Sequence, residues 1–341
     1  MDQTLLVGNG ISKLLNQEKL DWKAVLKSTL KADQQLLGEI ASGSSIIPYT
    51  HLYEDIMLNE KFGHHPNTDK IDLTELKKHI KSYLEDVLSQ PISSGFNNVA
   101  NQLLEINWNN ILTTNYEYTL ARVLTEKNYI YKKTRQQSVY STRRKHHYEN
   151  TNGKELDLWY IHGELDYVKS IMLGYDHYCG SLSKVSDYIK NGKLSDNLND
   201  DSTVSLKEDK GIHHILKKLF LYGNHDTVEY STWMDTFFFS DVHIIGLGLD
   251  FQEIDLWWML NKRHRYIKTM YALAPKYRDL RINNQIFYYG KTSKEIKAVL
   301  EAYGVDTTNT DDSSSKIDNW SVFYSENIAK IKENINNRKQ M

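Results

Sequence analysis

Cysteine is nearly absent from this chain of 341 residues, which contains Cys179 and no other. A single cysteine excludes an intramolecular disulfide and a four-cysteine zinc site. Proline is also scarce, at four residues, and neither sign of charge dominates, with 42 Lys and Arg against 44 Asp and Glu. This balance argues against a protein that coats nucleic acid.

No run of about 18 apolar residues occurs, so the sequence predicts no membrane span. The segment Met1–Gln3 has no basic region ahead of its short apolar run, which indicates a cytoplasmic location rather than secretion. Apolar residues make up 40% of the chain and charged residues 25%, which is ordinary globular usage. At roughly 150 residues per domain, the length fits two domains or one large α/β domain with insertions.

Short apolar segments alternate with helical patterns along the chain. We expect strands at 4–7, 110–114, 158–161, 171–174, 242–245, 270–273 and 285–288, and helices at 72–90, 98–106, 118–123, 233–238, 252–262 and 294–303. This alternation predicts an α/β fold of Rossmann-like type, with a mostly parallel sheet and helices on both faces. Helical insertions are expected at about 45–95 and 180–226.

We place the main domain at residues 1–305 and a linker with an amphipathic helix at 306–341. The linker, 307–315, is rich in Ser, Thr and Asp, and the helix is predicted by an apolar stripe of Tyr324, Ile328, Ile331 and Ile335. The stripe fits packing on its own domain or contact between protomers. The separate linker favours a mobile or intermolecular helix.

A glycine-rich turn follows the first predicted strand, with Gly8, Asn9, Gly10 and Ser12. Glycine at such a turn lets backbone N–H groups at a helix start approach a phosphate. Lys13 stands where the dinucleotide fingerprint requires a third glycine, which weakens the interpretation as a dehydrogenase. A plain tight turn explains the same residues.

Two polar motifs follow the next predicted strands. Thr114, Asn115 and Glu117 come after the strand at 110–114, where an Asn can hold a ribose hydroxyl or a water through both ends of its amide. Helix capping explains the same pattern. His162 and Gly163 end the strand at 158–161, and the imidazole suits general-base catalysis. A core histidine bonded to backbone is the alternative.

A second glycine turn follows the strand at 242–245, with Gly246, Gly248 and Asp250, and Asp255 lies five residues further on. The glycines allow close approach of a ligand to the backbone, and a nearby carboxylate can accept ribose hydroxyls. A left-handed turn followed by a helix cap is the alternative.

The order of these four motifs resembles the sirtuin superfamily. The resemblance covers about residues 4–305 with large gaps, and it is closer to the sirtuin-like proteins of bacterial anti-phage defence, which hydrolyse NAD⁺ when infection is sensed. This chain departs from zinc-bearing sirtuins by lacking the four-cysteine module. It also has Glu117 in place of an aspartate and Asn9 in place of an alanine.

The resemblance implies a role for each motif, with NAD⁺ as the substrate and no zinc or other metal. Residues of the first turn would bind the diphosphate, and Asn115 would position the nicotinamide-side ribose or the attacking water. Glu117 would orient Asn115 or contact ribose, beside Thr114. His162, before Gly163, would be the general base, and the second glycine turn with Asp250 would line the adenosine side. Alanine at Asn115 or His162 would then nearly abolish turnover without unfolding the chain.

The resemblance also implies a homo-oligomer, activated by a HerA-type partner ATPase or by a phage protein. One alternative is another enzyme activity, either protein deacylation or ADP-ribosyl transfer. The other alternative is a sensor that binds NAD⁺ or ADP-ribose without turnover. The basic stretch 132–147 fits a solvated loop better than a contact with nucleic acid or an acidic partner, and nucleic acid as a partner is left open.

Overall fold

The computed structural model describes residues 2–15, 25–26, 49–58, 73–88, 93–134, 138–191, 230–273, 284–311 and 317–340. The predicted insertion at 45–95 contributes two helices within these ranges. Of the insertion predicted at 180–226, residues 192–226 lie outside the described residues.

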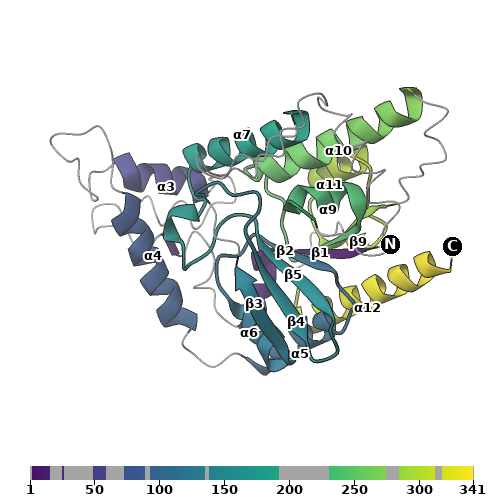
Figure 1. The fold of residues 1–341 in the computed structure, drawn as a ribbon, viewed down its shortest axis with the longest axis horizontal. Coiled ribbons are helices and arrows are strands. Elements are labelled where there is room, and N and C mark those ends of the chain that lie inside the picture. The colour runs from purple at the N-terminus through teal and green to yellow at the C-terminus, as the bar shows by residue number, and fades with distance from the viewer. Residues whose placement is uncertain are drawn as a thin grey trace.

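A nine-stranded sheet lies at the centre of the fold, in the order β3-β4-β5-β2-β1-β6-β7-β8, with β9 paired to β7 (Figure 1). Its strands are β1 Gln3–Val7, β2 Asn110–Thr113, β3 Tyr129–Thr134, β4 Lys145–Asn150, β5 Glu155–Tyr160, β6 Asp241–Ile245, β7 Ile286–Lys291, β8 Val305–Asp306 and β9 Thr310–Asp311. β4 runs antiparallel to both of its neighbours, and the other pairings are parallel.

The six strands β5-β2-β1-β6-β7-β8 form the parallel part of the sheet. In chain order they are the third, second, first, fourth, fifth and sixth parallel strands, which is the order of a doubly wound Rossmann sheet. The order reverses between β1 and β6, so a crevice is expected where Val7 and Ile245 end these strands. The predicted Rossmann-like α/β fold is confirmed.

Helices cover both faces of this sheet, because the buried strands present apolar side chains on both sides. They are η1 Asn9–Leu15, α3 Tyr49–Leu58, α4 Leu73–Leu88, α5 Ser94–Leu104, α6 Thr119–Glu126, η4 Val168–Ser170, α7 Tyr175–Asn191, α9 Trp233–Phe239, α10 Ile254–Leu273, α11 Lys294–Ala302 and α12 Trp320–Lys339. Within β1, Leu5 and Val7 pack in the core with α5 and α12, while Leu6 packs in the opposite core with α9 and α10. Figure 1 shows α7 and α10 above the sheet and α5 and α12 below it.

Two predicted strands are wrong. Residues 171–174 form an irregular buried segment, since Ile171 and Leu173 are apolar for packing in the core rather than for pairing in the sheet. Residues 270–273 are the last turn of α10, which runs on from the helix predicted at 252–262. Met, Ala and Leu are good helix formers, so the apolar run continues the helix.

The basic stretch at 132–147 is also not the solvated loop that the sequence favours. It contains the ends of β3 and β4, which pair with each other at one edge of the sheet. Arg144 and Lys145 are buried, with the Arg144 Nε 3.4 Å from a Glu164 carboxylate oxygen and the Lys145 Nζ 2.6 Å from Asp157. These two cations therefore pair with acids of their own chain.

The C-terminal helix α12 packs on the chain that carries it. Tyr324, Ile328, Ile331 and Ile335 belong to the same apolar core as α5, and Arg338 near the end of the helix pairs with the buried Asp241 at 2.8 Å. The stretch expected to be a linker contributes β9 to the sheet. The prediction of a mobile or intermolecular helix is wrong, because its apolar stripe is already covered.

No helix of the described ranges is both long and apolar enough to cross a membrane.

We predict that Ile331→Ala lowers the free energy of unfolding by about 2–5 kcal/mol, because Ile331 is completely buried and its loss leaves a cavity. Val322→Ala on the exposed side of the same helix serves as the control and should change stability by less than about 0.5 kcal/mol. Urea unfolding measures both variants. Equal effects would show that α12 is not packed as described.

Candidate functional site

The polar motifs found in the sequence follow the carboxyl ends of four adjacent strands. The first glycine turn follows β1, the Asn115 motif follows β2, His162 follows β5 and the second glycine turn follows β6. In a parallel sheet this edge is where ligands bind. The candidate site therefore lies along the carboxyl edge, on both sides of the switch point.

The two glycine turns contact each other directly. The Gly10 N–H donates a hydrogen bond to the Gly246 carbonyl oxygen at 2.7 Å, and a Cβ on Gly10 would lie 2.6 Å from that oxygen. A Cβ on Gly8 would lie 2.6 Å from Leu247 Cδ1. These glycines therefore let two loops approach each other, and the Gly10 N–H is not free for a phosphate, contrary to the expectation for a nucleotide loop. The Ser12 side chain lies outside the described residues.

Gly246 has φ +66, so the left-handed turn considered for this position is present. Gly248 has open space around it, since a Cβ added there would meet no described atom within 4 Å. Asp250 is exposed, and its backbone carbonyl accepts a hydrogen bond from the Glu253 N–H at 2.9 Å. Gly163 has φ +107 and packs against the Ser170 backbone, which leaves no space for a side chain.

A cavity of about 230 Å³ opens beside the second glycine turn. Its walls come from the two glycine turns, the end of β7 and the start of α12, including Gly248, Lys291, Trp320, Phe323 and Tyr324. A cavity with aromatic walls and a lysine suits a planar ring that carries a phosphate. The contribution of α12 to this cavity was not foreseen from the sequence.

Asn115 is held at one end and unpartnered at the other. Its amide nitrogen donates to Glu117 Oε1 at 3.1 Å, while its carbonyl oxygen Oδ1 is buried and has no hydrogen-bond partner among the described residues. Glu117 also accepts from the Thr119 backbone N–H at 2.5 Å, so its carboxylate binds the first residue of α6 as well as the Asn115 amide. Burial raises the pKa of Glu117, against the hydrogen bonds that it accepts. A buried acceptor without a donor is the feature that a bound hydroxyl or water would satisfy.

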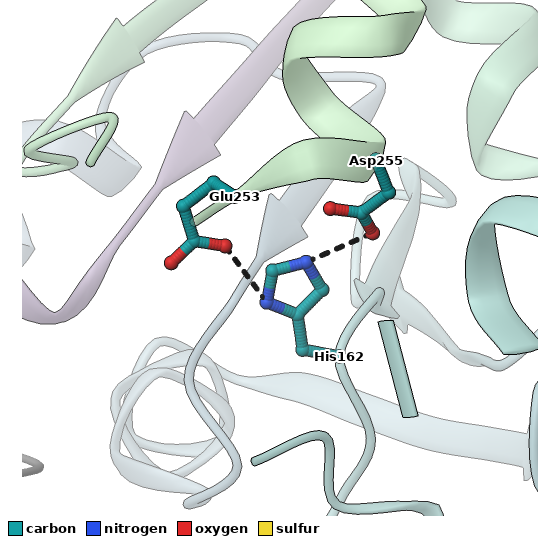
Figure 2. A group of neighbouring side chains, drawn as sticks. All are labelled: His162, Glu253 and Asp255. Atoms are coloured by element: carbon teal, nitrogen blue, oxygen red, sulfur yellow. Dashed lines mark hydrogen bonds and ion pairs between the residues drawn. The ribbon is translucent and has the colours of Figure 1, made fainter. Parts of the chain in front are cut away.

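His162 is enclosed between two carboxylates at the start of α10. Its Nε2 lies 3.1 Å from Asp255 Oδ2, and its Nδ1 lies 3.5 Å from Glu253 Oε2. Figure 2 shows the two carboxylates on opposite sides of the ring. Asp255 is fully buried and also accepts from Ser181 and from the Leu256 N–H, so it is not available to a ribose hydroxyl as the sequence suggested.

The charges of this group are set by burial and by the partners. Burial alone lowers the pKa of His162, but the negative charges of Asp255 and Glu253 outweigh it and raise the pKa to about 9. Burial raises the pKa of Glu253 to about 7, although the positive charge of His162 opposes the rise. The raised pKa favours the imidazolium form of His162 at neutral pH. With both nitrogens facing carboxylates it has no lone pair to offer, so the expected role of general base does not fit this arrangement.

The group of His162, Glu253 and Asp255 is also the one set of three in the described ranges whose ligand atoms, within 4.8 Å of one another, could hold a metal ion. A metal-bound histidine presents one nitrogen to the ion. Here the two carboxylates face different nitrogens, so the geometry favours a charged imidazole over a metal centre.

The segments that carry Asn115 and His162 are connected through Met172. Tyr116, next to Asn115, donates a hydrogen bond from its hydroxyl to the Met172 carbonyl oxygen, and the Met172 N–H donates to the His162 carbonyl oxygen at 3.0 Å. No hydrogen bond or ion pair between described side chains joins Asn115 to His162 directly. The irregular segment at 171–174 thus holds the ends of β2 and β5 in place.

Glu253 was missed in the sequence. A carboxylate just before a helix resembles an ordinary helix-start residue. The available signal was its spacing, since Glu253 and Asp255 flank one residue directly after a glycine turn.

No protein-family model matches this chain, and no curated protein matches it. The function is therefore inferred from the geometry of the site.

We predict that His162→Ala lowers the free energy of unfolding by about 3–5 kcal/mol, because the buried Asp255 and the largely covered Glu253 lose their cation. The expectation that this variant leaves the fold intact is thereby revised. His79→Ala, on the exposed face of α4, is the control and should be nearly neutral in urea unfolding. A neutral His162→Ala variant would contradict the buried ion pair.

Stability should fall as pH rises from 6.5 to 9. The pKa of His162 is higher in the folded chain, at about 9, than its ordinary 6.5, so its stabilising contribution is complete below pH 6.5 and is lost through pH 9. The raised pKa of Glu253, about 7, acts in the same direction between pH 4.5 and 7. The difference in unfolding free energy between the unsubstituted chain and His162→Gln should shrink from pH 6.5 to 9. A constant difference would contradict the raised pKa.

Proposed function

We propose that this chain binds NAD⁺ across the switch point of its sheet and hydrolyses it to ADP-ribose and nicotinamide. The observation that carries the proposal is Asn115, whose buried Oδ1 lacks a donor at the carboxyl end of β2 while Glu117 fixes the other end of its amide. A ribose hydroxyl or the attacking water supplies the missing donor.

Hydrolysis of NAD⁺ requires that the protein orient the ribose and the attacking water, and that it place negative charge near the ribose. As the bond between ribose and nicotinamide breaks, positive charge builds on the ribose, and nicotinamide leaves as a neutral molecule. Carboxylates near the crevice stabilise that charge, and a buried setting strengthens their effect. Glu117 and Glu253 supply carboxylates at this edge of the sheet.

The adenosine half of NAD⁺ fits the cavity beside β7 in this proposal. Trp320 and Phe323 offer aromatic faces for the adenine ring, and the open space at Gly248 gives the diphosphate a path toward β1. Because the Gly10 N–H already donates to the Gly246 carbonyl oxygen, the diphosphate binds at the second glycine turn rather than at the first in this proposal.

The resemblance to sirtuin-like defence proteins suggests a biological setting. In this proposal the chain depletes NAD⁺ in an infected bacterial cell, as part of a homo-oligomer that a HerA-type ATPase or a phage protein activates. Nicotinamide release should therefore be measured with the purified chain alone and after addition of lysate from phage-infected cells.

One observation favours a second function, a sensor that binds NAD⁺ without turnover. Both nitrogens of His162 face carboxylates, so the expected general base is occupied. Saturable binding of NAD⁺ by calorimetry, with no nicotinamide released under either condition, would establish the sensor and reject the hydrolase.

We predict that Asn115→Ala lowers the rate of nicotinamide release by about 10²–10³-fold, because the variant removes a positioned hydrogen-bonding group. Asn98→Ala, on the exposed face of α5, is the matched control and should retain the original rate. Chromatographic measurement of nicotinamide from NAD⁺ tests both. A rate within twofold of the original for Asn115→Ala would remove this residue from the mechanism.

A further inference from the structure

The two oxygens of the Glu253 carboxylate have different surroundings. Oε2 accepts a hydrogen bond from the Tyr178 hydroxyl at 3.3 Å and lies 3.5 Å from His162 Nδ1. No described residue donates a hydrogen bond to Oε1, and the side chain keeps 12% of its surface exposed. One oxygen is therefore held by the protein, and the other has no hydrogen-bond partner among the described residues.

Asp255 has no such freedom. Its side chain is completely buried, with Oδ2 facing His162 and Ser181 and Oδ1 accepting from the Leu256 N–H. Asp255 therefore completes the charge pair with His162 and cannot reach a substrate. Of the two carboxylates drawn in Figure 2, that of Glu253 has an oxygen without a hydrogen-bond partner among the described residues, whereas both oxygens of Asp255 have partners.

We propose that Glu253 is the proton acceptor for the attacking water at this site, and that His162 and Asp255 are positioning residues that hold its carboxylate. The proposal rests on the proposed hydrolysis of NAD⁺ and names the group that the reaction requires once His162 is excluded as the base. Glu253 stands between the second glycine turn and α10, and so lies at the carboxyl edge of β6.

Hydrolysis breaks one bond to the ribose and forms another. The bond between C1′ of the ribose and the nicotinamide nitrogen breaks, and its electron pair leaves with nicotinamide, which becomes neutral. The water oxygen forms a new bond to C1′, and one water proton passes to Oε1 of Glu253. Glu253 then loses that proton to solvent, so that NAD⁺ and water give ADP-ribose, nicotinamide and one proton.

The groups facing Glu253 explain why it can serve near neutral pH. Burial raises its pKa to about 7, which matches an acceptor that works at neutral pH. The positive charge of His162 and the Tyr178 hydrogen bond oppose this rise. The titratable groups around Glu253 come from five parts of the chain: Tyr49 on α3, Tyr116 after β2, His162 after β5, Tyr178 on α7, and Asp250 and Asp255 on either side of Glu253 itself.

The test is the pH profile of nicotinamide release, in whichever condition the unsubstituted chain is active. The rate should rise with pH through about 7 and then level off, as an acceptor loses its proton. Glu253→Gln keeps the shape of the side chain but cannot accept a proton. It should lower the rate by about 10²–10⁴-fold and abolish the rise with pH. Glu295→Gln is the matched control, since Glu295 is an exposed carboxylate in the first turn of α11.

Two further variants separate a catalytic loss from misfolding. Glu253→Ala should be rescued by formate, which replaces the missing carboxylate, whereas formate should not accelerate the unsubstituted chain. Glu253→Asp keeps the charge but shortens the side chain, and should retain part of the activity with the rise in rate near neutral pH. Thermal melting confirms that each variant is folded.

The outcomes distinguish the two proposals. If Glu253→Gln releases nicotinamide within threefold of the original rate, or keeps the original pH profile, the proposed role of Glu253 is overturned. The proposed hydrolysis of NAD⁺ is not contradicted by either result. Absence of release by the unsubstituted chain under every condition would overturn the hydrolase and the role of Glu253 with it. Activity that depends on added Zn²⁺ or Mn²⁺ and is lost with a chelator would assign His162, Glu253 and Asp255 to a metal instead.

Discussion

The buried pairing of His162 with Asp255 and Glu253 joins parts of the chain that are about 90 residues apart. It ties the end of β5 to the start of α10. Because α10 follows β6, the pairing joins segments from the two sides of the switch point. The positive charge of His162 offsets part of the cost of burying the two carboxylates, and their negative charges in turn raise the pKa of His162 to about 9. The arrangement of the carboxyl edge depends on this pairing because it joins the segments that follow β5 and β6.

The glycine turns after β1 and β6 also shape the carboxyl edge, through backbone contacts rather than through charge. Because Gly8 and Gly10 have no side chains, their loop lies directly against the Gly246 turn, and a backbone hydrogen bond joins the two loops. The usual interpretation of such glycines is close approach to a phosphate. In this chain they first bring two loops together, and the aromatic residues of α12 then complete a cavity beside them.

The division of roles between His162 and Glu253 follows from solvent access. A residue that transfers protons must reach both its substrate and a second proton carrier. The His162 side chain keeps 2% of its surface exposed and that of Glu253 keeps 12%, and only one of the two Glu253 oxygens has a partner among the described residues. In this proposal His162 positions the carboxylate of Glu253. The assignment depends on the tertiary structure, which shows the partner of each ring nitrogen.

Local sequence predicted the parallel strands except the short β8, most of the amphipathic helices and the positions of the polar motifs, because apolar periodicity and glycine turns act over a few residues. It misassigned the apolar segments at 171–174 and 270–273, since an apolar run alone does not distinguish a strand from buried coil or a helix end. The tertiary structure decided what contacts what. It paired Arg144 and Lys145 with acids elsewhere in the chain, covered the stripe of α12 with the core, and placed Glu253 against His162, because each of these contacts joins residues whose separation in the sequence carries no periodic signal.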